Sequence, residues 1–450
     1  MKQDQPIMDW HQLLSTKRFG QEEYHNKFPH DRTEFQRDYD RLIFSAPFRR
    51  LQNKTQVFPL PGSVFVHNRL THSMEVASVG RSLGNDVSKR LLDRHPELSE
   101  SNLKEIGSIV SAACLAHDLG NPPFGHSGEN AIATYFSEGE GLKYSHQMSE
   151  EEWSDIIHFD GNANTFRLLT HQFIGRRKGG FVMTYATLAS IVKYPFPSTE
   201  AGMKQKFGFF QSERDSYLRI ATELGLQQLR PDTGKMIYAR HPLVYLVEAA
   251  DDICYEVMDI EDAHKLKIMP TEKAQALLLS FFDEERQAHI RETFNEVTDI
   301  NEQIVYLRSS VIGLLEHECI KVFVENEEKI LSGEFRGCLL DHISPRPRKA
   351  YEECVAFSFA RIYRSKDVVD IEVAGYKIIY TLIDLFTNAV MSPEKKYSQL
   401  LLNRVSEQYE IHADTVYGRI MSILDYISGM TDVFALDLFR KINGTSIPLI

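Results

Sequence analysis

The sequence predicts an all-α protein, and three observations support that class. Apolar residues recur at helical spacing almost without interruption from about Glu34 to Lys441. Strand signals are sparse, and the clearest, the short alternating stretch Gly180–Thr184, is expected to form at most a small hairpin. No low-complexity tract, repeat or Pro/Gly/Ser-rich linker divides the chain. We therefore expect helices that pack against one another along the whole length.

The first predicted element is a helix over Arg32–Leu51, which Pro47 should interrupt. A polar and basic run follows it and enters a turn at Pro59–Gly62. Further helices are expected at about residues 68–94, 102–118, 126–137, 160–173, 184–194 and 241–265. Long amphipathic patterns with few chemically active groups occupy residues 271–441.

The length and composition allow a large core, because the chain has 450 residues of which 42% are hydrophobic. Since no linker is visible, we expect a single elaborated domain over residues 1–450. Its metal-binding core should lie at about 66–265 and a mainly helical C-terminal part at about 271–441.

The composition excludes several classes of protein. No apolar stretch approaches the roughly 20 residues that span a bilayer, and the first residues lack the apolar core of a signal peptide. We therefore expect a cytoplasmic protein that does not enter a membrane. Five cysteines without CxxC spacing are typical of reduced thiols, so zinc-finger and disulfide frameworks are excluded.

The formal net charge of −12 argues against binding nucleic acid through the overall field of the protein. Local basic clusters occur nevertheless: Arg49-Arg50 with Lys54, Arg176-Arg177-Lys178, and Arg346-Arg348-Lys349. We interpret the second cluster as solvated loop charge. The first lies beside the motifs that carry chemistry and would suit a polyphosphate.

The dipeptide His117-Asp118 closes an apolar run. An imidazole and a carboxylate at the end of a buried segment are costly unless something pairs with them, and a metal ion is the natural partner. His72, on an amphipathic stretch, and either Asp251 or Asp252, in a mostly apolar helix, extend the set. Nitrogen and oxygen ligands without thiolates suit Mn²⁺, Mg²⁺ or Fe²⁺ better than structural Zn²⁺.

Further polar groups accompany these candidate ligands. Arg69 lies one turn before His72 on the same helix face. Gly and Pro residues in Leu119–Gly125 should end the helix after the dipeptide, and His126 and Glu129 then share one face of the next helix.

The order of these groups resembles the HD-domain metal-dependent phosphohydrolases. More narrowly, six blocks look like the deoxyguanosinetriphosphate triphosphohydrolase family: Arg50–Leu60, Arg69–Val76, His117–His126, Phe159–Ala163, Glu248–Ile253 and Asp425–Asp432. The resemblance implies an HD-type helical fold with a helical C-terminal elaboration. It also implies hydrolysis of dGTP, or of dNTPs more broadly, to deoxynucleoside and tripolyphosphate, which regulates the dNTP pool.

The resemblance assigns roles residue by residue. The metal ligands are His72, His117, Asp118 and Asp251, the last preferred to Asp252 because it lies four residues before Tyr255. The metal is Mn²⁺ or Mg²⁺, with Fe²⁺ or Zn²⁺ as alternatives. His126, oriented by Glu129, would be the catalytic acid that protonates the departing 5′ oxygen. The implied substrate-binding residues are Lys54, Gln56, Val57, Arg69, Asn162, Lys193 and Tyr255.

Among these, Arg69 and Lys54 would neutralise phosphate charge, and Tyr255 would stack on the deoxyribose. The resemblance further implies a homo-oligomer, from dimer to hexamer, with an allosteric dNTP and single-stranded DNA as partners besides the substrate. Two alternatives stay open: an HD-type phosphodiesterase or phosphatase acting on another nucleotide, and a helical scaffold that binds nucleotides or nucleic acid.

Overall fold

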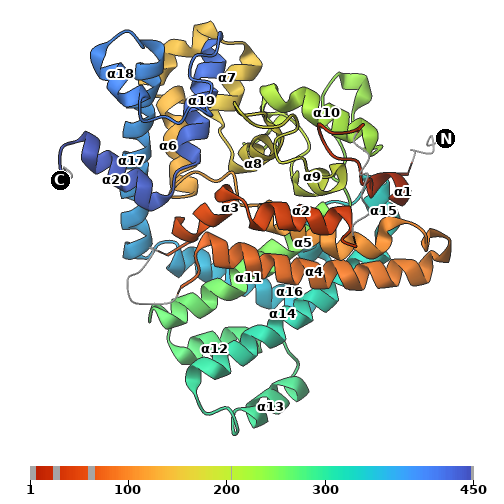
Figure 1. Ribbon diagram of the computed structural model, residues 1–450. Helices are drawn as coiled ribbons and strands as arrows, with labels where there is room; N and C mark the ends of the chain where they lie inside the picture. The colour runs from red at the N-terminus through yellow and green to blue at the C-terminus, as the bar shows by residue number, and fades with distance from the viewer. Residues whose placement is uncertain (1–6, 24–30, 59–65, 204, 447–450) are drawn as a thin grey trace.

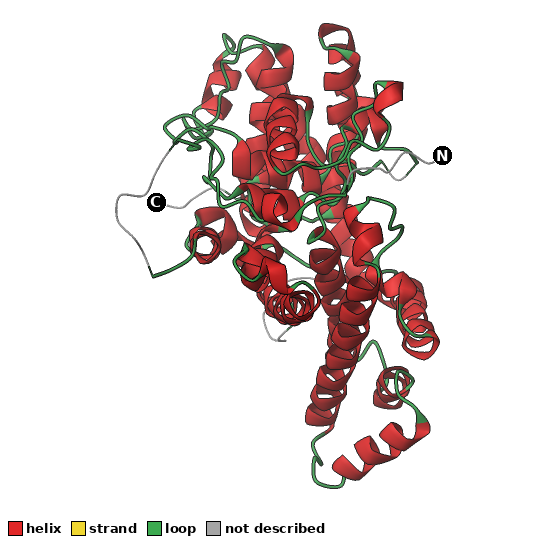
Figure 2. Cartoon of the chain, turned by 90° about the vertical axis from the view of Figure 1, so that its right-hand side faces the viewer, coloured by secondary structure: helices red, strands yellow, loops and turns green. Residues whose placement is uncertain are grey.

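The computed structural model describes residues 7–23, 31–58, 66–203 and 205–446, and it is built from helices (Figures 1 and 2). Within these ranges strand pairing is limited to isolated bridges, such as the one between Arg18 and Thr184. The prediction of an all-α protein is confirmed. No helix of this described part is long and apolar enough to cross a membrane.

The α-helices of the first half are α1 (Trp10–Leu13), α2 (Glu34–Ile43), α3 (Ala46–Arg50), α4 (Arg69–Arg94), α5 (Ile106–Ala116), α6 (His126–Ser137), α7 (Glu150–Ile157), α8 (Gly161–Thr170), α9 (Tyr185–Ile191), α10 (Arg214–Glu223) and α11 (Val244–Lys265). Those of the second half are α12 (Thr271–Leu279), α13 (Glu284–Thr293), α14 (Ile300–Glu325), α15 (Glu327–Leu331), α16 (Pro345–Phe357), α17 (Lys366–Met391), α18 (Lys396–Leu402), α19 (Val416–Ser428) and α20 (Asp432–Ile442). The predicted helices therefore exist, and most differ from the prediction by a few residues at their ends.

The predicted helix over Arg32–Leu51 is two helices. Thr33 caps α2 through a reciprocal capping box with Gln36, and the helix ends at Ile43. Ser45 then caps α3, so that Pro47 lies in the first turn of the new helix. A first-turn residue needs no N–H partner, and for this reason Pro47 helps to start a helix here and does not interrupt one.

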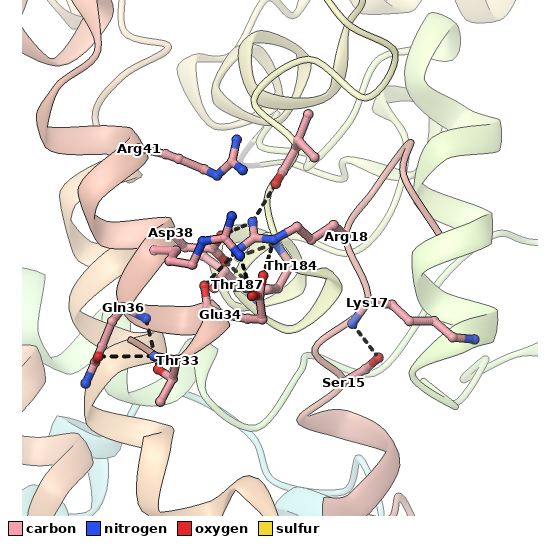
Figure 3. Close-up of polar contacts among 12 residues, drawn as sticks. Ser15, Lys17, Arg18, Thr33, Glu34, Gln36, Asp38, Arg41, Thr184 and Thr187 are labelled. Carbon is pink, nitrogen blue, oxygen red and sulfur yellow. Dashed lines mark hydrogen bonds and ion pairs between the residues drawn. The ribbon is translucent and has the colours of Figure 1, made fainter. Parts of the chain in front are cut away.

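The segment Gly180–Thr184, expected to form at most a small hairpin, forms no hairpin of its own. Gly180 and Phe181 lie in a turn, and Thr184 makes an isolated antiparallel bridge with Arg18. Figure 3 shows Asp38 of α2 beside Thr184: the carboxylate accepts hydrogen bonds from the Thr184 amide at 2.9 Å and the Thr184 hydroxyl at 2.6 Å. Arg18 pairs with Asp38 at 2.7 Å and donates to the Val182 carbonyl. These contacts, together with the backbone bridge to Arg18, satisfy this segment without a regular sheet. The turn predicted at Pro59–Gly62 lies outside the described residues.

The helices form two buried apolar clusters. In the first, α4, α5 and α11 pack against one another near the centre of Figure 1, with α2, α9 and α14 around them. In the second, α6 packs on α17, which in turn packs on α19. The loop between α5 and α6 therefore runs from the first cluster to the second, and it begins with His117 and Asp118.

A buried ion-pair network ties α8 to the C-terminal part of the chain. The Arg167 guanidinium donates to both carboxylate oxygens of Asp425, at 2.9 and 2.8 Å, and to Glu213 at 2.6 Å. All three side chains are buried. Burial opposes ionisation, yet Arg167 and then His171 hold the pKa of Glu213 below its usual range.

Candidate active site

Three predicted ligands meet where α4, α5 and α11 converge. The Nε2 atom of His72 lies 3.0 Å from Oδ1 of Asp251, and Nε2 of His117 lies 3.4 Å from the same oxygen. One ligand atom from each residue falls within 4.8 Å of the other two. Two imidazole nitrogens and a carboxylate oxygen at this spacing form a donor set that could hold a divalent cation.

The orientation of His117 supports this role. Its Nδ1 donates to the Cys114 carbonyl at 2.6 Å, which leaves Nε2 directed at Asp251. Burial disfavours the imidazolium, but Asp118 and Asp251 outweigh it and raise the pKa of His117 to about 9. His117 and His72 in turn overcome the effect of burial and hold the pKa of Asp251 well below its usual range. The acidic groups thus prefer a positive charge at this point, whether a proton or a metal ion supplies it.

Asp118 lies at the edge of this group. One carboxylate oxygen accepts from Arg69 at 2.7 Å and lies 3.7 Å from Nε2 of His117. Gly125, with φ of 54°, leaves the space that the Arg69 guanidinium occupies, because a Cβ there would come within 2.6 Å of Nη2. The Nε of Arg69 is buried without a partner among the described residues. Asp118 therefore links the candidate metal ligands to a buried cation.

Beside the metal group lies a cavity with a polar wall. It is lined by His117, Asp118 and Asp251, by the predicted residues Gln56, Arg69, Asn162, Lys193, His126, Glu129 and Tyr255, and by Asn121, Tyr194, Lys206 and Glu248 among others. A second cavity shares Gln56, Arg69, His126 and Tyr255 and adds Val57, Phe124, Phe359 and Tyr363. Most of the residues predicted from the sequence are thus brought together.

Lys54 is the exception, since it lines neither of these cavities. Its ammonium donates to the carbonyls of Asn121 at 2.5 Å and Ser428 at 2.9 Å, and the side chain is 2% exposed. Burial lowers the pKa of Lys54 to about 7. The geometry makes it a tie between the α5–α6 loop and the end of α19, and it corrects the expectation that Lys54 faces the phosphates.

The predicted contact between His126 and Glu129 is also wrong. His126 is exposed at the start of α6 and lines both cavities. The Glu129 carboxylate instead accepts from the Gly161 amide at 2.7 Å and pairs with Lys206 at 3.3 Å. His126 and Glu129 both lie in the first turn of α6, but they contact different neighbours, because the N-terminus of α8 packs against Glu129.

Lys206 is the residue that the sequence analysis missed. Its ammonium lies 3.3 Å from Glu129 and 3.5 Å from Asp160, and both carboxylates outweigh burial and raise its pKa. Lys193 is held in the same way by Glu248 at 3.2 Å, and its pKa is raised by Asp252 and Glu248 against the effect of burial. Nothing in the residues next to Lys206 marks it, because only the fold brings it to the cavity.

Tyr255 stands one helical turn after Asp251 on α11. Its ring packs edge-on against His72, with centroids 6.2 Å apart, and lies 6.1 Å from the ring of Tyr363. It therefore forms a wall shared by the polar cavity and the more apolar one. Gln56, which also lies on both, has a buried Oε1 without a partner in the described part of the chain.

Contacts from Gly429 and Asp432 hold the N-terminal segment Arg50–Gln56 near this site. Asp432, at the start of α20, accepts from the Thr55 amide at 2.8 Å and the Phe124 amide at 2.9 Å. Arg50 donates to the Gly429 carbonyl at 2.6 Å. Residues at the two ends of the sequence thus fix the position of Gln56 and of the α5–α6 loop.

The metal-capable group, its position at the end of α5 and the all-α architecture define an HD-domain protein, a class of metal-dependent phosphohydrolases. Residues 69–165 match the HD domain model, and residues 342–441 match the phosphohydrolase-associated domain model. The match to the HD domain begins at Arg69 and ends just after Asn164, so it contains His72, His117 and Asp118.

Curated relatives narrow this class. The chain is 36% identical over 458 residues to a deoxyguanosinetriphosphate triphosphohydrolase-like protein of Pseudomonas aeruginosa (strain LESB58), covering 98% of this chain and 100% of the relative. It is 37% identical to one of Synechocystis sp., with the same coverage, and 29% identical to a deoxyguanosinetriphosphate triphosphohydrolase of Yersinia pseudotuberculosis, covering 91% and 93%. The chain belongs to the deoxyguanosinetriphosphate triphosphohydrolase-like family.

Proposed function

We propose that this protein hydrolyses a deoxynucleoside triphosphate, dGTP first among them, to the deoxynucleoside and tripolyphosphate. One observation carries the proposal: residues that could hold a metal and three cationic side chains line the same cavity. The three cations are Arg69, Lys193 and Lys206. A triphosphate needs such a set of cations to offset its negative charge. The names of the curated relatives support the same substrate class.

His72, His117 and Asp251, together with Asp118, would hold a divalent cation, which when bound would supply Lewis-acid activation of the phosphate and of water. Mn²⁺ or Mg²⁺ suits this donor set, since it contains no thiolate. The protein groups around it do the remaining work: Arg69 is anchored by Asp118, and Lys193 and Lys206 are anchored by carboxylates that keep them charged.

His126 is the proposed catalytic acid. Its exposed ring lies at the boundary of the two cavities, where it can reach the 5′ oxygen of a sugar whose phosphates occupy the polar cavity. Glu129 acts on a different part of the site, because it positions Lys206 and the start of α8. Tyr255 and the unpartnered Oε1 of Gln56 are proposed to contact the sugar, and Val57 and Asn162 complete the substrate-binding set.

The resemblance also supports a homo-oligomer, an allosteric dNTP and single-stranded DNA as proposals, each to be tested separately. The first experiment is anion-exchange separation of the products formed from each dNTP, alone and mixed, with Mn²⁺ or Mg²⁺. The expected result is deoxynucleoside with tripolyphosphate. Release of monophosphate or free phosphate would instead favour a phosphodiesterase or phosphatase, and no turnover with any mixture would favour a binding scaffold.

Asp251→Asn and Asp252→Asn form a matched pair for this assay. The two carboxylates are adjacent on α11, but only Asp251 belongs to the metal-capable group. Asp251→Asn is expected to lower turnover about a hundredfold, because even loss of a group that supports a metal ligand costs about 10–100-fold. Asp252→Asn is expected to retain most of the turnover. Equal losses in the two variants would contradict the ligand assignment.

A further inference from the structure

A third cavity, which is lined by cationic side chains, lies on the other side of the α5–α6 loop. Arg50, Lys54 and Arg176 line it, together with Leu119, Asn164, Tyr409, Asp425 and Gly429 among others. It shares no lining residue with the polar cavity beside the metal group. Leu119 lines this cavity and Asn121 lines the polar cavity, so the loop segment 119–121 separates the two cavities.

The three cations come from two basic clusters that are far apart in the sequence. Arg50 is the last residue of α3 and Lys54 follows that helix. Arg176 belongs to the loop after α8, in the cluster that was expected to be solvated charge. Arg177 and Lys178 are indeed exposed. Arg176 differs from them, because its guanidinium lies over the rings of Phe173 and Phe181, 5.6 and 5.5 Å from their centroids, and is only partly exposed.

None of these three cations has a carboxylate partner within ion-pair distance among the described residues. Arg50 donates to the Gly429 carbonyl, and Lys54 donates to two carbonyls, which use two of its three N–H groups. Arg176 makes no side-chain hydrogen bond in that part of the chain. Lys54 is buried and the two arginines are half-buried, and cations in such positions are normally paired. This cavity therefore holds an excess of positive charge.

The nearby carboxylates do not remove this excess, because each is committed elsewhere. Asp425 binds Arg167 with both oxygens, and Arg167 also binds Glu213. Asp432 accepts two backbone amides. The consequence appears in the titration of the cations: burial, with Arg69 and Arg50, lowers the pKa of Lys54 to about 7, and burial, with Arg50, lowers that of Arg176.

We propose that this cavity is a second anion site, which binds one phosphate group of a small ligand through Arg50, Lys54 and Arg176. Two guanidinium groups and an ammonium are the donors that protein sites use for phosphate oxygens. Gly429 keeps the site open, since a Cβ at this position would lie 3.0 Å from Nη1 of Arg50 and 3.1 Å from the Tyr409 hydroxyl.

The site is linked to the metal group through the loop between them. Lys54 touches both the cavity and the Asn121 carbonyl, and Asn164 of the cavity wall donates to the Gly120 carbonyl at 2.7 Å. Asn121 itself donates to Asp118. A phosphate that fixes Lys54 therefore also fixes the loop that carries Asp118, and it stabilises the folded chain.

The test is calorimetric titration of the full chain, freed of metal by a chelator, with inorganic phosphate, tripolyphosphate and a deoxynucleoside monophosphate in turn. Comparison of the three separates free phosphate from the phosphate of a nucleotide as the preferred source. Arg176→Gln is expected to weaken binding of the best ligand about tenfold or more, because a charge-assisted contact is lost. Arg177→Gln, which changes the exposed neighbour, is the matched control and should bind within about twofold of wild type.

Lys193→Gln distinguishes this site from the polar cavity. With inorganic phosphate as the ligand, Lys193→Gln leaves the affinity unchanged if the anion binds where we propose, and Arg176→Lys, which keeps the charge, retains more affinity than Arg176→Gln. Loss of binding in Lys193→Gln but not in Arg176→Gln would place the anion in the polar cavity and overturn the proposal. Absence of binding by wild type at millimolar ligand would also overturn it. These outcomes do not depend on whether the chain hydrolyses dNTPs.

Discussion

His241 is a buried imidazole that should make the stability of this protein depend on pH. Its side chain is 1% exposed and lies just before α11, the helix that carries Asp251. Its Nε2 donates to the Leu13 carbonyl at 3.1 Å, and its Nδ1 accepts from the Leu243 amide at 3.2 Å. The Ser190 hydroxyl lies 3.4 Å from the same nitrogen. A proton on Nδ1 would face the Leu243 amide N–H, so the surroundings favour the neutral ring.

The size of the effect follows from the pKa. Burial lowers the pKa of His241 to about 4, and the Leu13 carbonyl opposes this only in part. In the unfolded chain an imidazole titrates at about 6.5. The unfolded state therefore takes up the proton first, and this part of the stability is fully present above about pH 6.5 and is lost as the pH falls towards 4. The difference between the pKa values of the folded and unfolded states corresponds to about 3 kcal/mol of the free energy of unfolding. About 2 kcal/mol of this should be lost by pH 5.

The assay is urea unfolding at pH 7.5, 6 and 5 for wild type, His241→Gln and His289→Gln. His289, whose side chain is 60% exposed, is the control for replacing a histidine. His241→Gln should be less stable at pH 7.5, because it loses a hydrogen bond, but between pH 7.5 and 5 it should lose about 2 kcal/mol less than the other two proteins. The reasoning is refuted if all three lose the same free energy over this range.

Three further predictions concern ion pairs and the metal group. Arg167→Met leaves Asp425 and Glu213 buried without their cation and should lower the free energy of unfolding by about 3–5 kcal/mol in urea; an unchanged midpoint would contradict it. Mn²⁺ at about 100 times its dissociation constant should raise the free energy of unfolding of wild type by about 2.7 kcal/mol, measured by thermal unfolding, and should leave Asp251→Asn unchanged. An equal stabilisation of both proteins would exclude the proposed metal ligands. Lys206→Met should reduce kcat/KM for a dNTP about tenfold or more, whereas Lys235→Met, which removes an exposed ion pair with Glu200, should not; matching losses would count against a role for Lys206.

The sequence was most informative where chemistry and local structure coincide. The helical period placed His126 at the start of a helix that runs to Ser137, as predicted. His72, His117 and one of the adjacent carboxylates Asp251 and Asp252 could be singled out because polar groups in apolar helices are costly. The family resemblance favoured Asp251, and the fold brings this carboxylate and the two histidines within reach of one ion. The segment Gly180–Thr184 shows the limit of a local pattern, because Asp38 and Arg18 satisfy that backbone from other parts of the chain.

The amino-acid sequence by itself determined the all-α class, the order of the helices and the residue types of the metal group, since helix periodicity and ligand chemistry are properties of neighbouring residues. Only the tertiary structure decided the partners of Glu129, the position of Lys54 outside the polar cavity, the arrival of Lys206 within it and the meeting of Arg50 with Arg176. These contacts join segments that are up to hundreds of residues apart, so they depend on how helices pack. That packing is set by the summed burial of many side chains, which no local motif reports.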